Sequence, residues 1–250
     1  MTGEQPDPPP AGLPAAPERV PFWGYADLFL LAGLALPCMF GGWAMVRLAM
    51  WIGRLPGGVQ GLEAVPAMVL GYILLFTLLK LIFLVQYGQP FWRSLGWTES
   101  RLPFAWNVIC GFGASLLVAL VAKLIRTPEI NGYLVDMMND RRSLILLGIF
   151  GTTAAPLFEE LAFRGFLQPL LVRSLGAVAG IGIASALFGA LHYSEYGDSW
   201  RPAVLIGVSG VAFGCVRHFA RSTKAAVIAH AVFNGLTFVS MYTLGKNAPH

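Results

Sequence analysis

Residues 28–46 read LFLLAGLALPCMFGGWAMV and contain no charged side chain. A helix needs about 20 predominantly apolar residues to cross the hydrocarbon core of a bilayer, and this stretch has nearly that length. Further charge-free runs follow along the chain, at residues 64–79, 102–122, 143–158, 174–194, 202–216 and 225–245. These runs predict about seven membrane-spanning helices, within a range of about six to eight.

The overall composition also indicates a membrane protein. Hydrophobic residues make up 56% of the chain and charged residues only 12%, about half the charged share of a typical soluble domain. Lipid admits only helices and closed barrels as spanning structures, and the apolar runs are continuous and do not alternate. The predicted fold class is therefore all-α, a polytopic transmembrane helical bundle. The expected location is a membrane, crossed several times, and the plasma membrane if the chain is prokaryotic.

The chain divides into a short tail and one membrane domain. Residues 1–22 are rich in proline and lack the basic stretch of an export signal, so we expect a disordered tail there. Residues 23–250 form the predicted membrane domain. Its catalytic core is expected at about residues 143–245, after a polar loop at residues 126–142.

The charge and cysteine content argue against two kinds of site. The net charge of +4 is modest, and most of the Lys and Arg residues lie between predicted spans, where they flank a membrane surface. We therefore expect the lipid bilayer as a partner, and no nucleic acid. Cys38, Cys110 and Cys215 lie far apart in apolar runs, so no disulfide framework or cysteine metal site is indicated.

Two adjacent acidic residues stand out from the other acidic residues of the chain. Only Glu159 and Glu160 lie inside a long apolar helix, predicted at residues 143–172 with a kink at Pro156. An ionisable residue at that depth costs about 2.5 to 3.5 kcal/mol on insertion scales. The helix could instead leave the membrane at Phe158, but the residues after the pair are again mostly apolar. We interpret the pair as part of a functional site.

Helix geometry separates the roles of the two carboxylates. Glu160 and Arg164 are four residues apart, so they share a helix face and can form an ion pair. Glu159 points about 100° away from that face and lacks this built-in partner. A carboxylate in that position can take a proton from water and return it to a leaving amine.

Three polar residues on later predicted helices complete a chemical set. His192 ends an apolar run, and by itself would be typical of a histidine at the membrane interface. His230 lies within another apolar run, with Asn234 one turn later on the same face. Such residues can simply join helices by hydrogen bonds. Together with Glu159 they supply one base, two imidazoles and one amide donor, which suffice to activate water and stabilise an oxyanion.

Three motifs in this order resemble one family. They are Glu-Glu-x-x-x-Arg ending at Arg164, Phe-x-x-x-His ending at His192, and His-x-x-x-Asn ending at Asn234. Together they resemble the CPBP family, also called the Abi family, which contains CAAX prenyl proteases and bacteriocin-processing enzymes. The resemblance covers residues 143–243 and implies an intramembrane endopeptidase. Its substrate would be a peptide or protein, either prenylated or a leader peptide.

The resemblance also implies a role for each residue of the motifs. Glu159 and His192 would activate the attacking water, while His230 and Asn234 would stabilise the oxyanion. Arg164 with Glu160 would hold the site together. Members of the family are often called metalloproteases, although the chain has no His-Glu-x-x-His spacing. We favour metal-free general-base catalysis. Zinc stays the alternative, held by Glu159, His192 and His230 in a set that fits zinc's His₂Glu preference.

Other functions were weighed against this one. The Gly-x-Ser-Gly sequence at residues 207–210 is typical of rhomboid serine proteases, but here it precedes the His-x-x-x-Asn motif, which reverses the rhomboid order. We expect Gly207, Gly210 and Gly214 to serve close helix packing, with Ser209 hydrogen-bonded locally. A proton-coupled transporter would also use buried Glu and His, but no internal repeat is visible. The principal alternative is a non-catalytic scaffold or immunity-type membrane protein that binds a partner.

Overall fold

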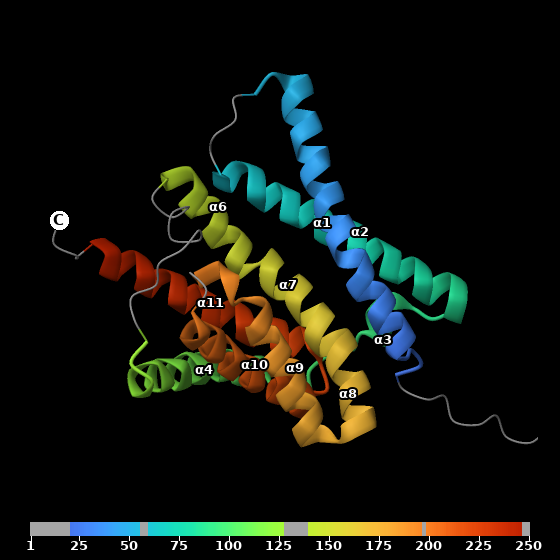
Figure 1. Ribbon diagram of the computed structural model, residues 1–250. Coiled ribbons are helices and arrows are strands. Elements are labelled where there is room, and N and C mark those ends of the chain that lie inside the picture. Colours follow the sequence, from blue (N-terminus) through green and yellow to red (C-terminus); the bar gives the residue numbers. More distant parts are fainter. Residues whose placement is uncertain (1–20, 56–59, 128–139, 197–198, 247–250) are drawn as a thin grey trace, which may run out of the picture.

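The computed structural model describes residues 21–55, 60–127, 140–196 and 199–246, and every regular element in these ranges is a helix (Figure 1). Residues 1–20 of the predicted tail and residues 128–139 of the predicted polar loop lie outside the described residues. Six helical segments in the described part of the chain are long and apolar enough to cross a membrane. The prediction of a helical bundle with six to eight spans is confirmed, and the chain is a multi-pass membrane protein.

The first two helices form an antiparallel pair. Helix α1 (Tyr25–Gly53) packs mainly against α2 (Gln60–Tyr87). The two backbones approach closely at Gly42, where a Cβ atom would lie only 2.3 Å from the Ala67 carbonyl oxygen. The absence of a side chain at Gly42 permits this approach. Near the other end of the pair, the Tyr87 hydroxyl donates to the Asp27 carboxylate at 2.8 Å. A second polar contact joins the helices where Arg47 donates to the Glu63 carboxylate at 3.0 Å, so small residues and two polar contacts position α1 on α2.

A second group of helices packs around α11. The short helix α3 (Phe91–Ser94) leads to α4 (Phe104–Leu124), which packs against α10 (Trp200–Ala220) and α11 (Thr223–Lys246). The segment between α3 and α4 fastens the α10–α11 turn. The Ser222 hydroxyl donates to the Thr98 carbonyl oxygen, and the Thr223 hydroxyl donates to the Leu95 carbonyl oxygen, both at 2.6 Å. These two hydrogen bonds hold the start of α11 against the segment between α3 and α4.

The helical path that carries the two glutamates is continuous but irregular. It consists of α6 (Arg141–Thr152), α7 (Ala154–Glu160), the π-helical segment η1 (Leu161–Leu167) and α8 (Gln168–Leu175). At its start, the backbone N–H of Ser143 donates to the Asp140 carboxylate at 2.8 Å, which caps α6 and lowers the pKa of that carboxyl group.

The predicted kink lies close to Pro156, at Thr153, where φ is −128° and ψ is −77°. The cause is local, because Pro156 has no N–H for the carbonyl of Thr152, four residues earlier, and its ring crowds that carbonyl. The π-helical segment that follows the glutamates was not predicted. π-Helical turns are rare and are frequently found at functional sites.

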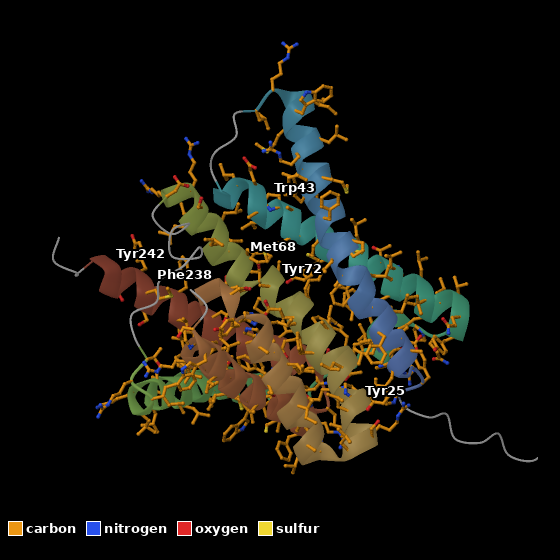
Figure 2. All side chains as sticks on the ribbon, in the orientation of Figure 1. Tyr25, Trp43, Met68, Tyr72, Phe238 and Tyr242 are labelled. Atoms are coloured by element: carbon orange, nitrogen blue, oxygen red, sulfur yellow. The ribbon has the colours of Figure 1, made fainter. Side chains whose placement is uncertain are left out.

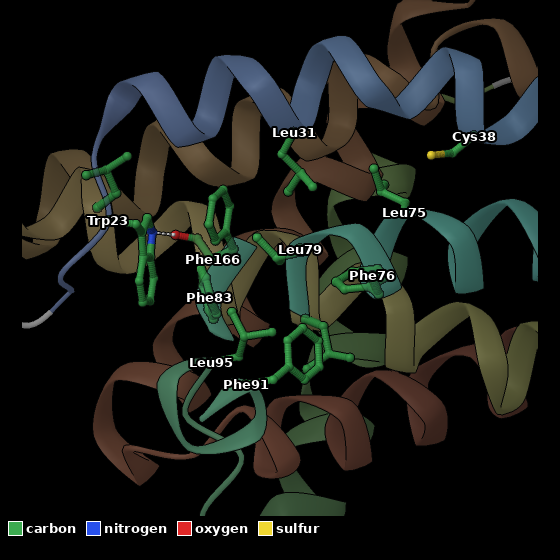
Figure 3. Close-up of a cluster of buried hydrophobic side chains, with 12 residues drawn as sticks. Trp23, Leu31, Cys38, Leu75, Phe76, Leu79, Phe83, Phe91, Leu95 and Phe166 are labelled. Atoms are coloured by element: carbon green, nitrogen blue, oxygen red, sulfur yellow. Dashed lines mark hydrogen bonds between the residues drawn. The ribbon is translucent and has the colours of Figure 1, made fainter. Parts of the chain in front are cut away.

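An aromatic core packs against the π-helical segment (Figure 3). Trp23 precedes α1, and its indole N–H donates to the Phe166 carbonyl oxygen of η1 at 3.1 Å. The Trp23 and Phe166 rings are stacked, with centroids 5.3 Å apart. Phe83 of α2 lies against both rings. This core joins the α1–α2 pair to the helical path that carries the glutamates.

Helix α9 (Ala177–Leu191) is too short to count among the six long spans, and the 3₁₀ turn η2 (Ser194–Tyr196) follows it. It packs tightly between α8 and α10. A Cβ atom at Gly180 would lie 2.6 Å from the backbone nitrogen of Val172 in α8, and one at Gly189 would lie 2.3 Å from the Ala203 carbonyl oxygen in α10. This packing places the end of α9, which His192 follows, beside the first turn of α10.

Candidate active site

Glu160 is the centre of the polar cluster. Its side chain is fully buried, and its Oε1 atom accepts hydrogen bonds from Arg164 Nη1 and from His230 Nδ1, both at 2.9 Å. The predicted ion pair between Glu160 and Arg164 is therefore confirmed. The second oxygen of Glu160 is buried without a hydrogen-bond partner in the described part of the chain.

The Arg164 guanidinium connects this cluster to α10. It is 1% exposed, and its Nη2 atom donates to the Gly210 carbonyl oxygen at 2.8 Å. The guanidinium also lies over the Phe188 ring, 4.6 Å from its centroid. A Cβ atom at Gly210 would lie 3.2 Å from Nη2, so glycine gives the guanidinium its space. Sequence reasoning predicted close packing at Gly210 but missed its carbonyl as a partner of the site.

Glu159 faces the other nitrogen of the same imidazole. Its Oε2 atom lies 3.8 Å from His230 Nε2, and its side chain is 19% exposed. The two adjacent carboxylates therefore lie near the two different nitrogens of the His230 ring. Glu160 does so by a direct hydrogen bond, and Glu159 across a short gap. The sequence spacing predicted two different environments for the carboxylates but did not predict that His230 would connect them.

His230 is held in place by aromatic rings. Phe213 of α10 stacks on the imidazole with centroids 4.4 Å apart, and Phe188 of α9 meets it edge-on at 5.9 Å. The residue is 3% exposed. The ring can hardly turn within this packing, so its Nδ1 atom stays with Glu160 and its Nε2 atom stays toward Glu159.

His192 lies at the rim of the cluster. Its Nδ1 atom is 2.8 Å from the Phe188 carbonyl oxygen, which can only accept, so Nδ1 carries the hydrogen. The free Nε2 atom lies 4.0 Å from Glu195 Oε2. The rings of His192 and Phe188 are in contact, with centroids 4.8 Å apart. Phe188 thus contacts both histidines of the predicted site, and His192 is the more exposed one, at 17%.

Asn234 lies one turn beyond His230 on α11. Its amide nitrogen Nδ2 donates to the Gly151 carbonyl oxygen at 2.7 Å. Gly151 belongs to the last turn of α6, just before the interruption at Thr153. This bond engages one of the two amide hydrogens and leaves the other for a further acceptor.

Residues 141–236 match the family described as type II CAAX prenyl endopeptidase Rce1-like. This segment is an Rce1-like domain. The match is consistent with the CPBP family of intramembrane proteases, so the predicted resemblance is confirmed. No curated protein matches the chain, and no solved structure matches it.

The Rce1-like domain extends from α6 to the middle of α11 and contains all six predicted site residues. Its family supports an intramembrane protease in general terms. Helices α1, α2, α3 and α4 lie outside the matched residues, although the aromatic core around Trp23 packs directly on the domain's π-helical segment.

The serine of the Gly-x-Ser-Gly sequence has a local partner within the Rce1-like domain. The Ser209 hydroxyl donates to the Ile206 carbonyl oxygen at 2.8 Å, and the residue is buried. The predicted local hydrogen bond is confirmed. This contact leaves the hydroxyl without a histidine partner in the described part of the chain, and a nucleophilic serine needs such a base.

The arrangement of possible metal ligands bears on the zinc alternative. A structural or catalytic zinc site needs three or four ligands at about 2.0–2.3 Å from one point. Among the described residues, no three His, Cys, Asp or Glu side chains come together closely enough to hold a metal ion. In the Rce1-like domain, His230 Nδ1 is occupied by Glu160, and His192 directs its free nitrogen toward Glu195. The set of Glu159, His192 and His230 therefore does not fit zinc in this arrangement.

Proposed function

We propose that this protein is an intramembrane endopeptidase in which the Glu159 carboxylate activates water. The observation that carries the proposal is the pair of carboxylates on one imidazole, with Glu160 at 2.9 Å from His230 Nδ1 and Glu159 at 3.8 Å from Nε2. Glu159 is the more exposed of the two carboxylates, so it is the one that water can reach.

The Glu160–Arg164 pair supports a defined state of His230. Because the Arg164 charge balances the Glu160 charge, the carboxylate needs only a hydrogen-bond donor from His230 and no second cation. A neutral ring with its hydrogen on Nδ1 meets that need. The lone pair of Nε2 then faces Glu159, and the aromatic packing around the ring keeps it there.

A water molecule fits this pair of acceptors. The distance of 3.8 Å between Glu159 Oε2 and His230 Nε2 is too long for a direct hydrogen bond, yet one water can contact both atoms. Its two hydrogens would point to the carboxylate and the imidazole, and its oxygen lone pair would face the substrate carbonyl. Glu159 takes a proton as the oxygen attacks and later delivers it to the leaving amine.

His192 and Asn234 take supporting roles in this proposal. His192 presents a free Nε2 acceptor at the exposed rim, where it helps to hold and activate the incoming water. Asn234 has one amide hydrogen left after its bond to Gly151, and this hydrogen can stabilise the developing oxyanion. Sequence reasoning gave His230 the same oxyanion role as Asn234. Its bond to Glu160 favours a water-binding role instead, because a neutral Nε2 atom cannot donate.

The family description suggests a substrate class. The matched family is one of CAAX prenyl endopeptidases, so a prenylated C-terminal tail is one candidate substrate. A leader peptide is the other. Both are peptides that a membrane delivers to a site within the bundle.

A comparison of cellular peptides tests the proposal and requires no known substrate. Peptide termini are identified in membranes of cells that carry the wild type, Glu159→Gln, or Glu99→Gln at matched expression. Glu99 is a suitable control because its side chain is 90% exposed and pairs with Lys224, away from the site. We expect a set of termini in the wild type and in Glu99→Gln that is absent from Glu159→Gln. Identical termini in all three strains would favour the non-catalytic scaffold.

A further inference from the structure

The site holds few free hydrogen-bond donors for an oxyanion. His230 Nδ1 is engaged by Glu160, and His192 Nδ1 by the Phe188 carbonyl oxygen. Asn234 has one amide hydrogen left. Hydrolysis of a peptide bond places a negative charge on the carbonyl oxygen, and preorganised donors directed at that oxygen are worth large factors in rate. A second uncommitted donor near Glu159 would add to this stabilisation.

Tyr72 belongs to α2, outside the matched residues 141–236, but lies next to the site. Its ring stacks on Phe158, the residue before Glu159, with centroids 4.9 Å apart and the planes 20° from parallel. In Figure 2, Tyr72 lies halfway along α2, where this helix passes the path of α6 and α7. The ring also packs against the small cluster of Val65, Phe150 and Ala155. Because Ala155 is four residues before Glu159, the two share a face of α7, so these contacts place the Tyr72 ring beside the face of α7 that carries Glu159.

The Tyr72 hydroxyl is uncommitted. It makes no hydrogen bond with any residue that the structure describes, and it is not among the buried polar atoms that lack a partner. It is therefore open to water or to a ligand. The ring itself packs between two apolar clusters, which a phenylalanine would do equally well. Packing accounts for the ring but leaves the hydroxyl without a role.

We propose that Tyr72 is a further catalytic residue, whose hydroxyl donates a hydrogen bond to the carbonyl oxygen of the scissile bond. This inference rests on the proposed peptidase function. As the water oxygen bonds to the carbonyl carbon, one proton of the water passes to Glu159, and the carbonyl π electrons move to the oxygen. The phenol O–H hydrogen-bonds to that oxygen without losing its proton. When the carbonyl reforms, the C–N bond breaks and the amine takes the proton from Glu159.

This role would give the N-terminal helices a part in the chemistry. Tyr72 lies outside residues 141–236, so the matched domain would carry the base and one oxyanion donor, while α2 supplies the second donor. The donors would approach from different helices, since Asn234 is on α11 and Tyr72 is on α2. A substrate carbonyl bound between these helices could meet both.

The test removes the hydroxyl and keeps the ring. Tyr72→Phe is compared with the wild type and with Tyr25→Phe, a tyrosine at the start of α1 that is 41% exposed (Figure 2). The probe is a synthetic peptide that spans a cleavage site recovered from wild-type membranes. The protein is assayed in lipid nanodiscs for kcat, KM and melting temperature. We expect Tyr72→Phe to lower kcat by about 10²- to 10³-fold, with KM and melting temperature unchanged. Tyr25→Phe should match the wild type.

The possible results separate this inference from the function on which it rests. If the wild type yields no termini that depend on Glu159, the proposed function fails and the inference fails with it. If the wild type cleaves and Tyr72→Phe cleaves at the same rate, only the inference is overturned. It is also overturned if the loss of activity in Tyr72→Phe is matched by a lower melting temperature, because the hydroxyl would then be structural.

Discussion

The buried ion pair of Glu160 and Arg164 is the most demanding feature at the scale of single residues. Each charged group loses its water on burial, and the pair recovers that cost only through good geometry and further hydrogen bonds. Arg164 has both, because it donates to Glu160 and to the Gly210 carbonyl oxygen. Desolvation of the two charged groups costs free energy. The paired Glu160 carboxylate in turn orients His230 through its hydrogen bond to Nδ1.

Removal of the arginine should therefore destabilise the fold. Arg164→Ala leaves the fully buried Glu160 charge without its cation, and we expect the free energy of unfolding to fall by about 3–5 kcal/mol. Denaturant unfolding in detergent micelles measures the change. Arg142→Ala, which removes an exposed arginine at the start of α6, should stay within about 0.5 kcal/mol of the wild type. Equal effects of the two changes would contradict the account of the pair.

The ion pair within this cluster could be predicted from the sequence because both of its residues lie on one helix. The spacing of Glu160 and Arg164 fixes a contact within one helix, and the structure has that contact. The Gly210 carbonyl and the choice of imidazole nitrogen could not be predicted. Both depend on how α10 and α11 pack against η1, and a backbone carbonyl carries no signature in the sequence.

At the scale of elements, helix α9 depends on glycines for its position. Gly180 faces α8 and Gly189 faces α10, and at both positions a side chain would collide with backbone atoms. Gly182 lies on the same helix with nothing within 4 Å of an added Cβ atom. The small residues of α9 thus fall into two groups, and only one of them brings helices together.

These two groups give a matched pair of substitutions. Gly189→Ala pushes α9 away from the Ala203 carbonyl oxygen, and we expect a loss of about 1–3 kcal/mol in unfolding free energy, together with reduced peptidase activity because His192 shifts. Gly182→Ala should be neutral, or stabilising by up to about 1 kcal/mol, since alanine favours helix. Thermal unfolding and cleavage of the same peptide measure both. A larger loss at Gly182 than at Gly189 would contradict the packing described here.

The helical path through α6, α7 and η1 has two irregularities, and only the interruption near Pro156 could be predicted from the sequence. The interruption near Pro156 follows from the chemistry of one residue, so the sequence predicts it. The π-helical turn is held by an indole N–H from Trp23, which is 143 residues away in sequence from its acceptor Phe166. A pattern within a single helix cannot contain that information.

At the scale of the whole molecule, contacts between helix ends define two faces. Arg173 at the end of α8 donates to the Trp23 carbonyl oxygen before α1, which places these ends on the first face. Arg201 at the start of α10 donates to the Arg126 carbonyl oxygen after α4, which places these on the second face. Helix α9 must therefore connect the two faces, although it is shorter than the six long spans. We therefore expect α9 to be a seventh crossing, in addition to the six helices that are long and apolar enough to span.

This arrangement predicts that the two ends of the bundle lie on opposite sides of the membrane. Tyr25 begins α1 on the first face, and Tyr242 lies near Arg141 on the second face (Figures 1 and 2). Tyr25→Cys and Tyr242→Cys are labelled separately with a membrane-impermeant maleimide in sealed vesicles of one orientation. We expect only one of the two cysteines to react until the vesicles are opened. Reaction of both in intact vesicles would contradict the arrangement.

The range of six to eight spans could be predicted because charge-free runs of about 20 residues are long enough to cross the hydrocarbon core. The orientation in the membrane could not be predicted. Lys and Arg residues occur at both faces, for example Arg201 on the second and Arg173 on the first, so a difference in positive charge gives no direction.

The proposed peptidase activity depends on Glu159 as the general base and not on a serine nucleophile. The most direct measurement compares the rates at which wild type, Glu159→Gln and Ser209→Ala, each purified in lipid nanodiscs, cleave the peptide recovered from wild-type membranes. General-base catalysis by Glu159 predicts a loss of about 10²- to 10⁴-fold in Glu159→Gln. Ser209→Ala should cleave as fast as the wild type, because its hydroxyl only bonds to Ile206. An inactive Ser209→Ala beside an active Glu159→Gln would contradict the account.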